Sequence, residues 1–170
     1  RFLQLCSNDN MQVLNCTTPA NYFHALRRQM HRSFRKPLII MTPKSLLRNK
    51  YCVSNLEDFN KNNTFHRVLW DHAIDPKSKG FIELKESSKI KKVILCSGKV
   101  YFDLLDAREK LKRDDVVMYR IEQLYPFPAK ALVKELKPYA KNAQFFWCQE
   151  EPKNMGAWFS VRDYIQWTLD

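Results

Sequence analysis

Ser97, Gly98 and Lys99 form the segment of this sequence that is best suited to binding an anion. They follow an apolar run of strand length and precede a run with helical spacing. Backbone N–H groups at the start of a helix favour a negative charge, and Lys99 adds a cation. The segment predicts either a site for a phosphate-bearing ligand or a tight turn with Lys99 in solvent. One glycine falls short of a P-loop or dinucleotide motif.

Carboxylates follow two of the predicted strands. Glu122 comes directly after one apolar run, and Gln149, Glu150 and Glu151 come after another. Ligands and partner chains gather at the carboxyl ends of parallel strands. Because no nucleophile or metal-binding pattern lies nearby, the sequence favours interface contacts for these residues over acid–base chemistry.

The histidines and cysteines lack the spacing of metal ligands. The five cysteines form no CxxC pair, and the four histidines share no ligand spacing with carboxylates or cysteines. An odd number of widely spaced cysteines indicates reduced thiols in the bacterial cytoplasm or the mitochondrial matrix. We predict no metal site and no catalytic residue in this chain.

The net charge of +11 comes from 29 Lys and Arg against 18 Asp and Glu, and its densest part spans residues 27–50. This pattern favours a solvated helix face and a basic subunit interface. Nucleic-acid binding would require aromatic residues interleaved with the basic ones on a sheet face, and that pattern is missing. No apolar run approaches the roughly 20 residues of a membrane span. The sequence begins with Arg1 to Gln4 in the middle of a pattern and without the features of a signal peptide, so we expect the chain to be part of a longer polypeptide.

The first part of the chain predicts a strand–helix–strand unit. A short strand over residues 11–16 precedes Thr18 and Pro19, which suit the N-cap and the first position of a helix. Pro37 ends the helix, and residues 38–41 form a second buried strand. The apolar stripe of the helix recurs at spacings of three and four and consists of Phe23, Leu26, Met30 and Phe34.

Strands and helices alternate in the last part of the chain. This alternation predicts a mostly parallel sheet flanked by helices. We expect three segments, 1–48, 49–89 and 90–170, of which the middle one is a polar connection. The predicted strands cover residues 92–96, 116–120 and 145–148, and the predicted helices cover 100–112, 126–137 and 157–169. The inward residues predicted for the first two helices are Leu104, Leu105, Leu111, Leu132, Val133 and Leu136.

Four strings resemble, in order, the first component of 2-oxoglutarate dehydrogenase. Residues 35–48 (RKPLIIMTPKSLLR) are similar to the end of its pyrimidine-binding domain. Residues 95–101 (LCSGKVY), 120–128 (RIEQLYPFP) and 147–158 (WCQEEPKNMGAW) are similar to its C-terminal domain. The resemblance implies a transketolase-like C-terminal domain at 90–170, preceded by the last strand–helix–strand of a pyrimidine-binding domain at 1–48.

The resemblance also implies the activity of a parent enzyme. Members of this family use thiamine diphosphate and Mg²⁺ to decarboxylate 2-oxoglutarate and pass the succinyl group to lipoyl groups in the citric acid cycle. They form homodimers and act with dihydrolipoyl succinyltransferase and dihydrolipoyl dehydrogenase. The GDGxxxN motif of the metal–diphosphate site is missing from this sequence. We therefore expect no cofactor here, and a role as scaffold and dimer interface.

Some bacterial members bind acetyl-CoA on this domain, and Ser97, Lys99 and Gln149 match positions near that pocket. Glu57 stands where an arginine is expected in those relatives. A partly exposed apolar face is also expected, because the strand–helix–strand unit would lack the rest of its sheet. The alternatives are a 2-oxoadipate dehydrogenase homologue and a free-standing basic α/β module that binds CoA or a nucleotide. The residues expected at interfaces are Arg35, Lys44, Arg48, Glu122, Gln149, Glu150 and Trp158.

Overall fold

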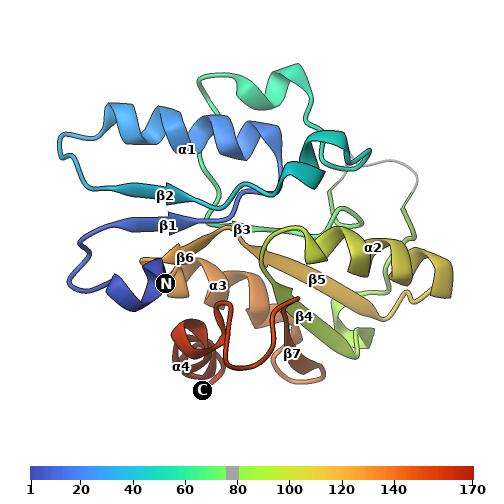
Figure 1. Cartoon of the computed structure of the whole chain (residues 1–170). Coiled ribbons are helices and arrows are strands. Elements are labelled where there is room, and N and C mark those ends of the chain that lie inside the picture. Colours follow the sequence, from blue (N-terminus) through green and yellow to red (C-terminus); the bar gives the residue numbers. More distant parts are fainter. Residues whose placement is uncertain (76–80) are drawn as a thin grey trace.

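The computed structural model describes residues 1–75 and 81–170 and contains two small sheets (Figure 1). The first sheet has the strand order β2-β1-β6, from β1 (Gln12–Leu14), β2 (Leu38–Ile40) and β6 (Gln123–Tyr125). Strands β1 and β2 are parallel, as the strand–helix–strand pattern predicts, and β6 pairs antiparallel with β1. The last part of the chain thus adds a strand to the sheet of the first part.

The second sheet has the order β3-β5-β4-β7 and carries the main core. Strands β4 (Lys92–Cys96), β5 (Val116–Ile121) and β7 (Gln144–Cys148) are parallel, which confirms the mostly parallel sheet. The short β3 (Val68–Leu69) pairs antiparallel with β5. Neither β3 nor β6 was predicted, because two or three residues carry no periodicity that a pattern can detect.

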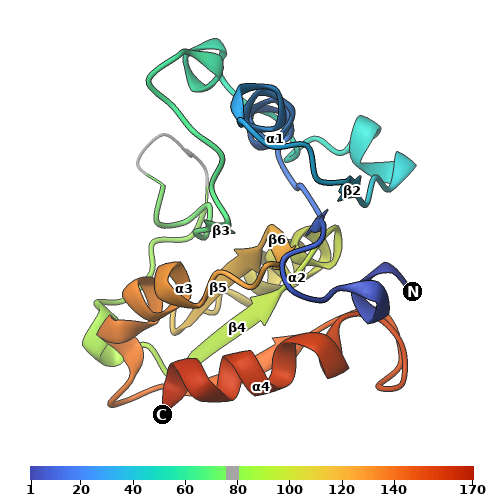
Figure 2. The same cartoon turned by 90° about the vertical axis from the view of Figure 1, so that its left-hand side faces the viewer.

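Helices cover both faces of the second sheet. On one face, buried residues of α3 (Ala129–Leu136) and α4 (Trp158–Leu169) pack on β4 and β5. On the other face, α2 (Val100–Leu111) packs through Tyr101 and Leu105. Figure 2 shows α4 along the bottom of this layered unit and α1 at the top of the molecule.

Two predicted inward residues are exposed instead. Leu111 is 71% exposed and Val133 is 42% exposed. Leu111 is the last residue of α2, just before Lys112 leaves the helix with a φ of 50°, so the sheet no longer lies beneath it. In α3 the buried positions are Leu132 and Leu136, four residues apart, which leaves Val133 on the flank of the helix.

Helix α1 (Pro19–His31) begins as predicted, with the Thr18 side chain accepting a hydrogen bond from the Asn21 N–H and with Pro19 at the first position. The helix ends at His31, so Phe34 lies outside it. The second strand is only partly buried, contrary to expectation, because β2 lies at the edge of its sheet.

The connection between the two parts contains short turns of 3-10 helix at Leu56–Phe59 and Ser87–Lys89, and another turn at Lys44–Arg48 directly precedes it. Further 3-10 turns lie at Phe2–Leu5 and Lys137–Tyr139. The composition of residues 75–80 (DPKSKG) also predicts a turn or surface excursion, and residues 76–80 lie outside the described residues. Within the described part of the chain, no helix is long and apolar enough to cross a membrane.

Candidate functional site

The predicted anion-binding segment lies at the carboxyl ends of β4 and β7. There the Lys99 ammonium group forms an ion pair with the Glu150 carboxylate, and the Ser97 hydroxyl donates to the Ile121 carbonyl at 2.9 Å. Gly98 has a φ of 77°, and a Cβ at this position would meet the Asn15 side chain. Lys99 and Ser97 therefore already have partners within the chain.

Gln149 organises the loop that follows β7. Its Oε1 accepts from the Trp147 indole N–H at 3.0 Å and from the Trp158 backbone N–H at 3.1 Å. Its Nε2 donates to the carbonyls of Glu151, Pro152 and Met155. The structure brings Ser97, Lys99 and Gln149 to the carboxyl ends of the strands, where each side chain contacts another segment of the chain. Their role in effector binding stays a prediction.

Glu122 joins the two parts of the chain. Its fully buried carboxylate accepts from the Thr17 N–H at 2.9 Å, from Asn21 Nδ2 at 3.0 Å and from the Thr17 hydroxyl. Arg120 in turn donates to Thr17 Oγ1 at 3.1 Å. Burial raises the pKa of Glu122, against the opposing effects of Arg120 and the hydrogen bonds. The carboxylate thus connects β5 to the start of α1.

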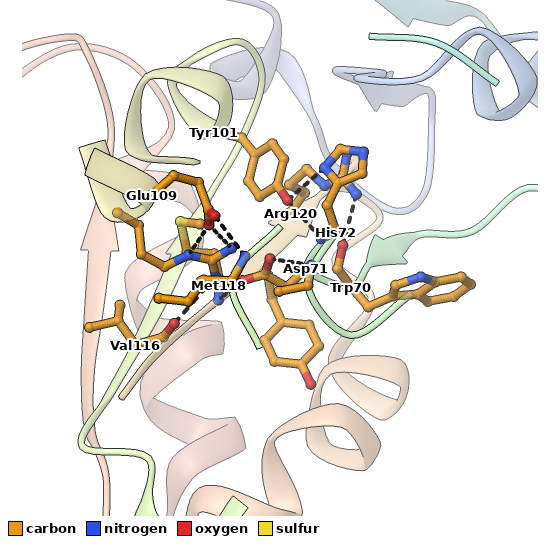
Figure 3. A network of polar contacts seen from close by, with 12 residues as sticks. Trp70, Asp71, His72, Tyr101, Glu109, Val116, Met118 and Arg120 are labelled. Atoms are coloured by element: carbon orange, nitrogen blue, oxygen red, sulfur yellow. Dashed lines mark hydrogen bonds and ion pairs between the residues drawn. The ribbon is translucent and has the colours of Figure 1, made fainter. Parts of the chain in front are cut away.

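A second buried network fixes the polar connection against α2 and β5 (Figure 3). The Asp71 carboxylate forms an ion pair with Arg108 and accepts from the Met118 N–H at 2.9 Å. Next to it, the His72 N–H donates to the Tyr101 hydroxyl at 2.9 Å, and that hydroxyl lies 2.8 Å from His72 Nδ1.

The His72 imidazole is held in its neutral form. Burial, together with Arg120 and Arg108, lowers the pKa of His72 to about 3. The sequence did not indicate the network of Asp71, Arg108 and His72. The ion pair joins Asp71 to Arg108, which are 37 residues apart, and no sequence motif links residues at such a separation. The spacing of charges along one helix can be read from a sequence, but a pair between distant segments requires the fold.

A basic groove between α1 and α3 has a volume of about 690 Å³. Burial, with Arg32 and Arg67 nearby, lowers the pKa of Arg28 to about 10. Among the lining residues that the structure describes, Glu135 is the only carboxylate. The remaining charged or titratable lining residues are His24, Arg27, Arg28, His31, His66, Arg67 and Lys134.

The predicted interface residues lie in different settings. Arg35, Lys44 and Arg48 are exposed, and Arg35 donates to the carbonyls of Arg32 and Phe34. Trp158 is half-buried at the first turn of α4. The structure brings Lys99, Glu150, Gln149 and Trp158 into one loop cluster and places Glu122 apart from them.

The described residues do not gather the donors of a metal site. Within residues 1–75 and 81–170, no group of three or more His, Cys, Asp or Glu side chains could hold an ion. The five cysteines are free thiols. Burial raises the pKa of Cys96, which lies beside Cys148 on neighbouring strands. These thiols pack as small apolar side chains.

Comparisons with known proteins match both parts of the chain. The family model for the 2-oxoglutarate dehydrogenase C-terminal region matches residues 53–170, and the model for the transketolase pyrimidine-binding domain matches residues 1–50. Over 169 residues the chain is 60% identical to the 2-oxoglutarate dehydrogenase E1 components of Brucella abortus (strain S19) and Brucella ovis. The alignment covers 99% of this chain and 17% of each relative.

Proposed function

This chain belongs to the 2-oxoglutarate dehydrogenase C-terminal family, and on that premise we propose that it is the C-terminal part of a 2-oxoglutarate dehydrogenase E1 component. The parent oxidatively decarboxylates 2-oxoglutarate and transfers the succinyl group to lipoyl groups in the citric acid cycle. The observation that carries this proposal is the 60% identity over 99% of the chain. The identity extends through both parts of the chain, in the order of the two family matches.

A comparison of substrates with the parent protein tests this proposal. The full natural polypeptide is assayed for carbon dioxide release from 2-oxoglutarate, 2-oxoadipate and pyruvate at equal concentrations. We expect the highest kcat/KM with 2-oxoglutarate. A higher kcat/KM with 2-oxoadipate would support the 2-oxoadipate homologue instead, and no turnover with any of the three would refute the assignment.

The parent is proposed to use thiamine diphosphate and Mg²⁺, which supply the carbanion chemistry when bound. The described residues do not fit that group, because they gather no metal-ligand set and the sequence lacks a Gly-Asp-Gly motif. We derive no catalytic step from this chain. Its residues contribute packing and contact surface.

The scaffold role is supported by the contacts of Glu122. One buried carboxylate binds the start of α1, while β6 pairs with β1, so the two parts are held together at two points. The exposed Arg35, Lys44 and Arg48 are proposed to contact the second subunit of a homodimer. The parent is further proposed to act in the cytoplasm of a bacterium with dihydrolipoyl succinyltransferase and dihydrolipoyl dehydrogenase.

The basic groove is proposed as the site of an anionic effector such as acetyl-CoA. Phe65 and Trp70 line the groove together with Arg28, whose pKa is lowered by burial and by the nearby Arg32 and Arg67. A bound phosphate would relieve the repulsion between Arg28 and Arg67, and such charge-assisted hydrogen bonds are the strong ones. The loop around Lys99 offers less, since Glu150 already neutralises Lys99.

Calorimetry on the parent with acetyl-CoA and with inorganic phosphate separates the two positions. Arg67→Ala is expected to weaken acetyl-CoA binding by about tenfold, which corresponds to about 1.4 kcal/mol, while Lys99→Ala leaves it unchanged. The reverse result would place the effector at Ser97, Lys99 and Gln149. Equal affinity of the two variants for acetyl-CoA would refute the groove as the effector site.

A further inference from the structure

Helix α1 has large apolar side chains on the side opposite its buried face, and one of them, Phe23, also contacts Phe59, with ring centroids 5.5 Å apart. Its buried face consists of small and polar residues: Ala20, Asn21, His24 and Ala25. Phe23, Leu26 and Met30 are 40%, 45% and 72% exposed. At 100° per residue these two sets lie on opposite sides of the helix. A solvated helix shows the reverse arrangement, so α1 has the pattern of a helix that is covered on both sides.

The exposed apolar side lies within a strongly basic part of the chain. Residues 10–56 contain no Asp or Glu. Arg32, Arg35 and Lys36 follow the last residue of the helix, His31, along the chain. The eight cations of the 10–56 segment are Arg27, Arg28, Arg32, Arg35, Lys36, Lys44, Arg48 and Lys50.

This charge distribution restricts what can cover the stripe. Two copies of α1 packed face to face would bring like charges together without an acidic residue between them, which is unfavourable. A complementary surface has an apolar centre and a rim of Asp and Glu. An isolated apolar stripe of this kind on a soluble protein marks a protein contact.

We propose that the outer face of α1 docks on an apolar surface with an acidic rim, supplied by another part of the same parent polypeptide. This inference rests on the proposed function. The chain spans 17% of the length of its relatives, so most of such a parent is available to form that surface. Docking within one polypeptide is also favoured by its high effective concentration.

Photo-crosslinking in the full parent protein tests this proposal. The photoreactive residue p-benzoylphenylalanine replaces Met30 in one variant and Leu111 in a matched control. Both positions are helical, apolar and equally exposed, at 72% and 71%. We expect position 30 to link to an Asp- or Glu-containing peptide outside residues 1–170 of the same polypeptide, with a yield about tenfold above that at position 111.

Three results would overturn the proposal. They are equal yields at the two positions, a link from position 30 to α1 of a second copy, and a link to a different protein of the complex. Carbon dioxide release by the unmodified parent is measured in parallel. Absent turnover counts against the proposed function, whereas the crosslinked peptide reports on the docking surface alone.

A charge-reversal variant of this chain tests whether the docking surface has an acidic rim. Arg35→Glu, combined with the crosslinker at position 30, is expected to lower the yield about two- to fivefold, the scale of an exposed ion pair. Lys110→Glu serves as the control on α2, where it faces a different part of the surface. An unchanged yield in Arg35→Glu would contradict the acidic rim.

Discussion

Replacing Glu122 with alanine is expected to loosen the connection between the two parts of the chain. The substitution removes the acceptor of two fixed buried donors, the Thr17 N–H and Asn21 Nδ2. A buried donor without an acceptor costs ~1–3 kcal/mol. Arg120, which is also buried, loses a carboxylate with which its charge interacts. Together these effects lower the free energy of unfolding by ~3–5 kcal/mol, the usual cost of removing one partner of a buried charge pair.

Urea denaturation at pH 7 measures this loss. Asp106→Ala is the matched control, because Asp106 is a half-exposed carboxylate whose ion pair with Lys110 lies on the surface, and such pairs contribute ~0–1 kcal/mol. We expect the loss for Glu122→Ala to exceed that for Asp106→Ala clearly. A difference of less than about 1 kcal/mol, the scale of an exposed ion pair, would contradict this expectation.

The pH dependence of Glu122 provides a second readout. Burial raises its pKa in the folded state above that in the unfolded chain. A carboxyl group with a raised folded pKa contributes stability below the unfolded value of about 4.3, and this contribution is lost as the pH rises through the folded pKa. The chain with Glu122 is therefore expected to lose stability relative to the Glu122→Gln variant as the pH is raised from 4 to 8. A constant difference over this range would contradict the raised pKa.

Two further substitutions and one titration probe the other buried contacts. Asp71→Asn leaves Arg108 without its buried carboxylate and is expected to lower the free energy of unfolding by ~3 kcal/mol in urea; a loss below ~1 kcal/mol would show that the pair is solvated. Because the pKa of His72 is lowered to about 3, its ring is expected to show no titration by NMR between pH 8 and pH 4. Stability is expected to fall as the pH drops below about 6.5, because only the unfolded chain takes up that proton. An NMR titration midpoint of His72 near pH 6.5 would contradict this. Gly98→Ala is expected to cost ~1–3 kcal/mol because of its positive φ and its contact with Asn15, and an unchanged urea midpoint would contradict it.

The long elements could be predicted because their patterns are local. The strands at 92–96, 116–121 and 144–148 are apolar runs bounded by turns, and the helix start at Thr18 and Pro19 follows from side chains two or three residues apart. The parallel arrangement of the second sheet follows from the alternation of strands and helices. These features need no knowledge of distant contacts.

The orientation of α1 and the buried networks could not be predicted, because they depend on residues far apart in the chain. The stripe of Phe23, Leu26 and Met30 predicts an amphipathic helix but does not tell which side meets the sheet. Glu122 was expected at an interface from its position after a strand, yet its partner Thr17 lies 105 residues away. Lys99 has the sequence context of an anion site, but Glu150, 51 residues later, neutralises it.

We propose that this chain forms the non-catalytic C-terminal part of a 2-oxoglutarate dehydrogenase E1 component. Release of labelled carbon dioxide from [1-¹⁴C]2-oxoglutarate, with thiamine diphosphate and Mg²⁺ added, is measured side by side for the parent and for residues 1–170. We expect turnover by the parent and none above background by residues 1–170. Turnover by residues 1–170 alone, or a parent that leaves 2-oxoglutarate unchanged, would contradict it.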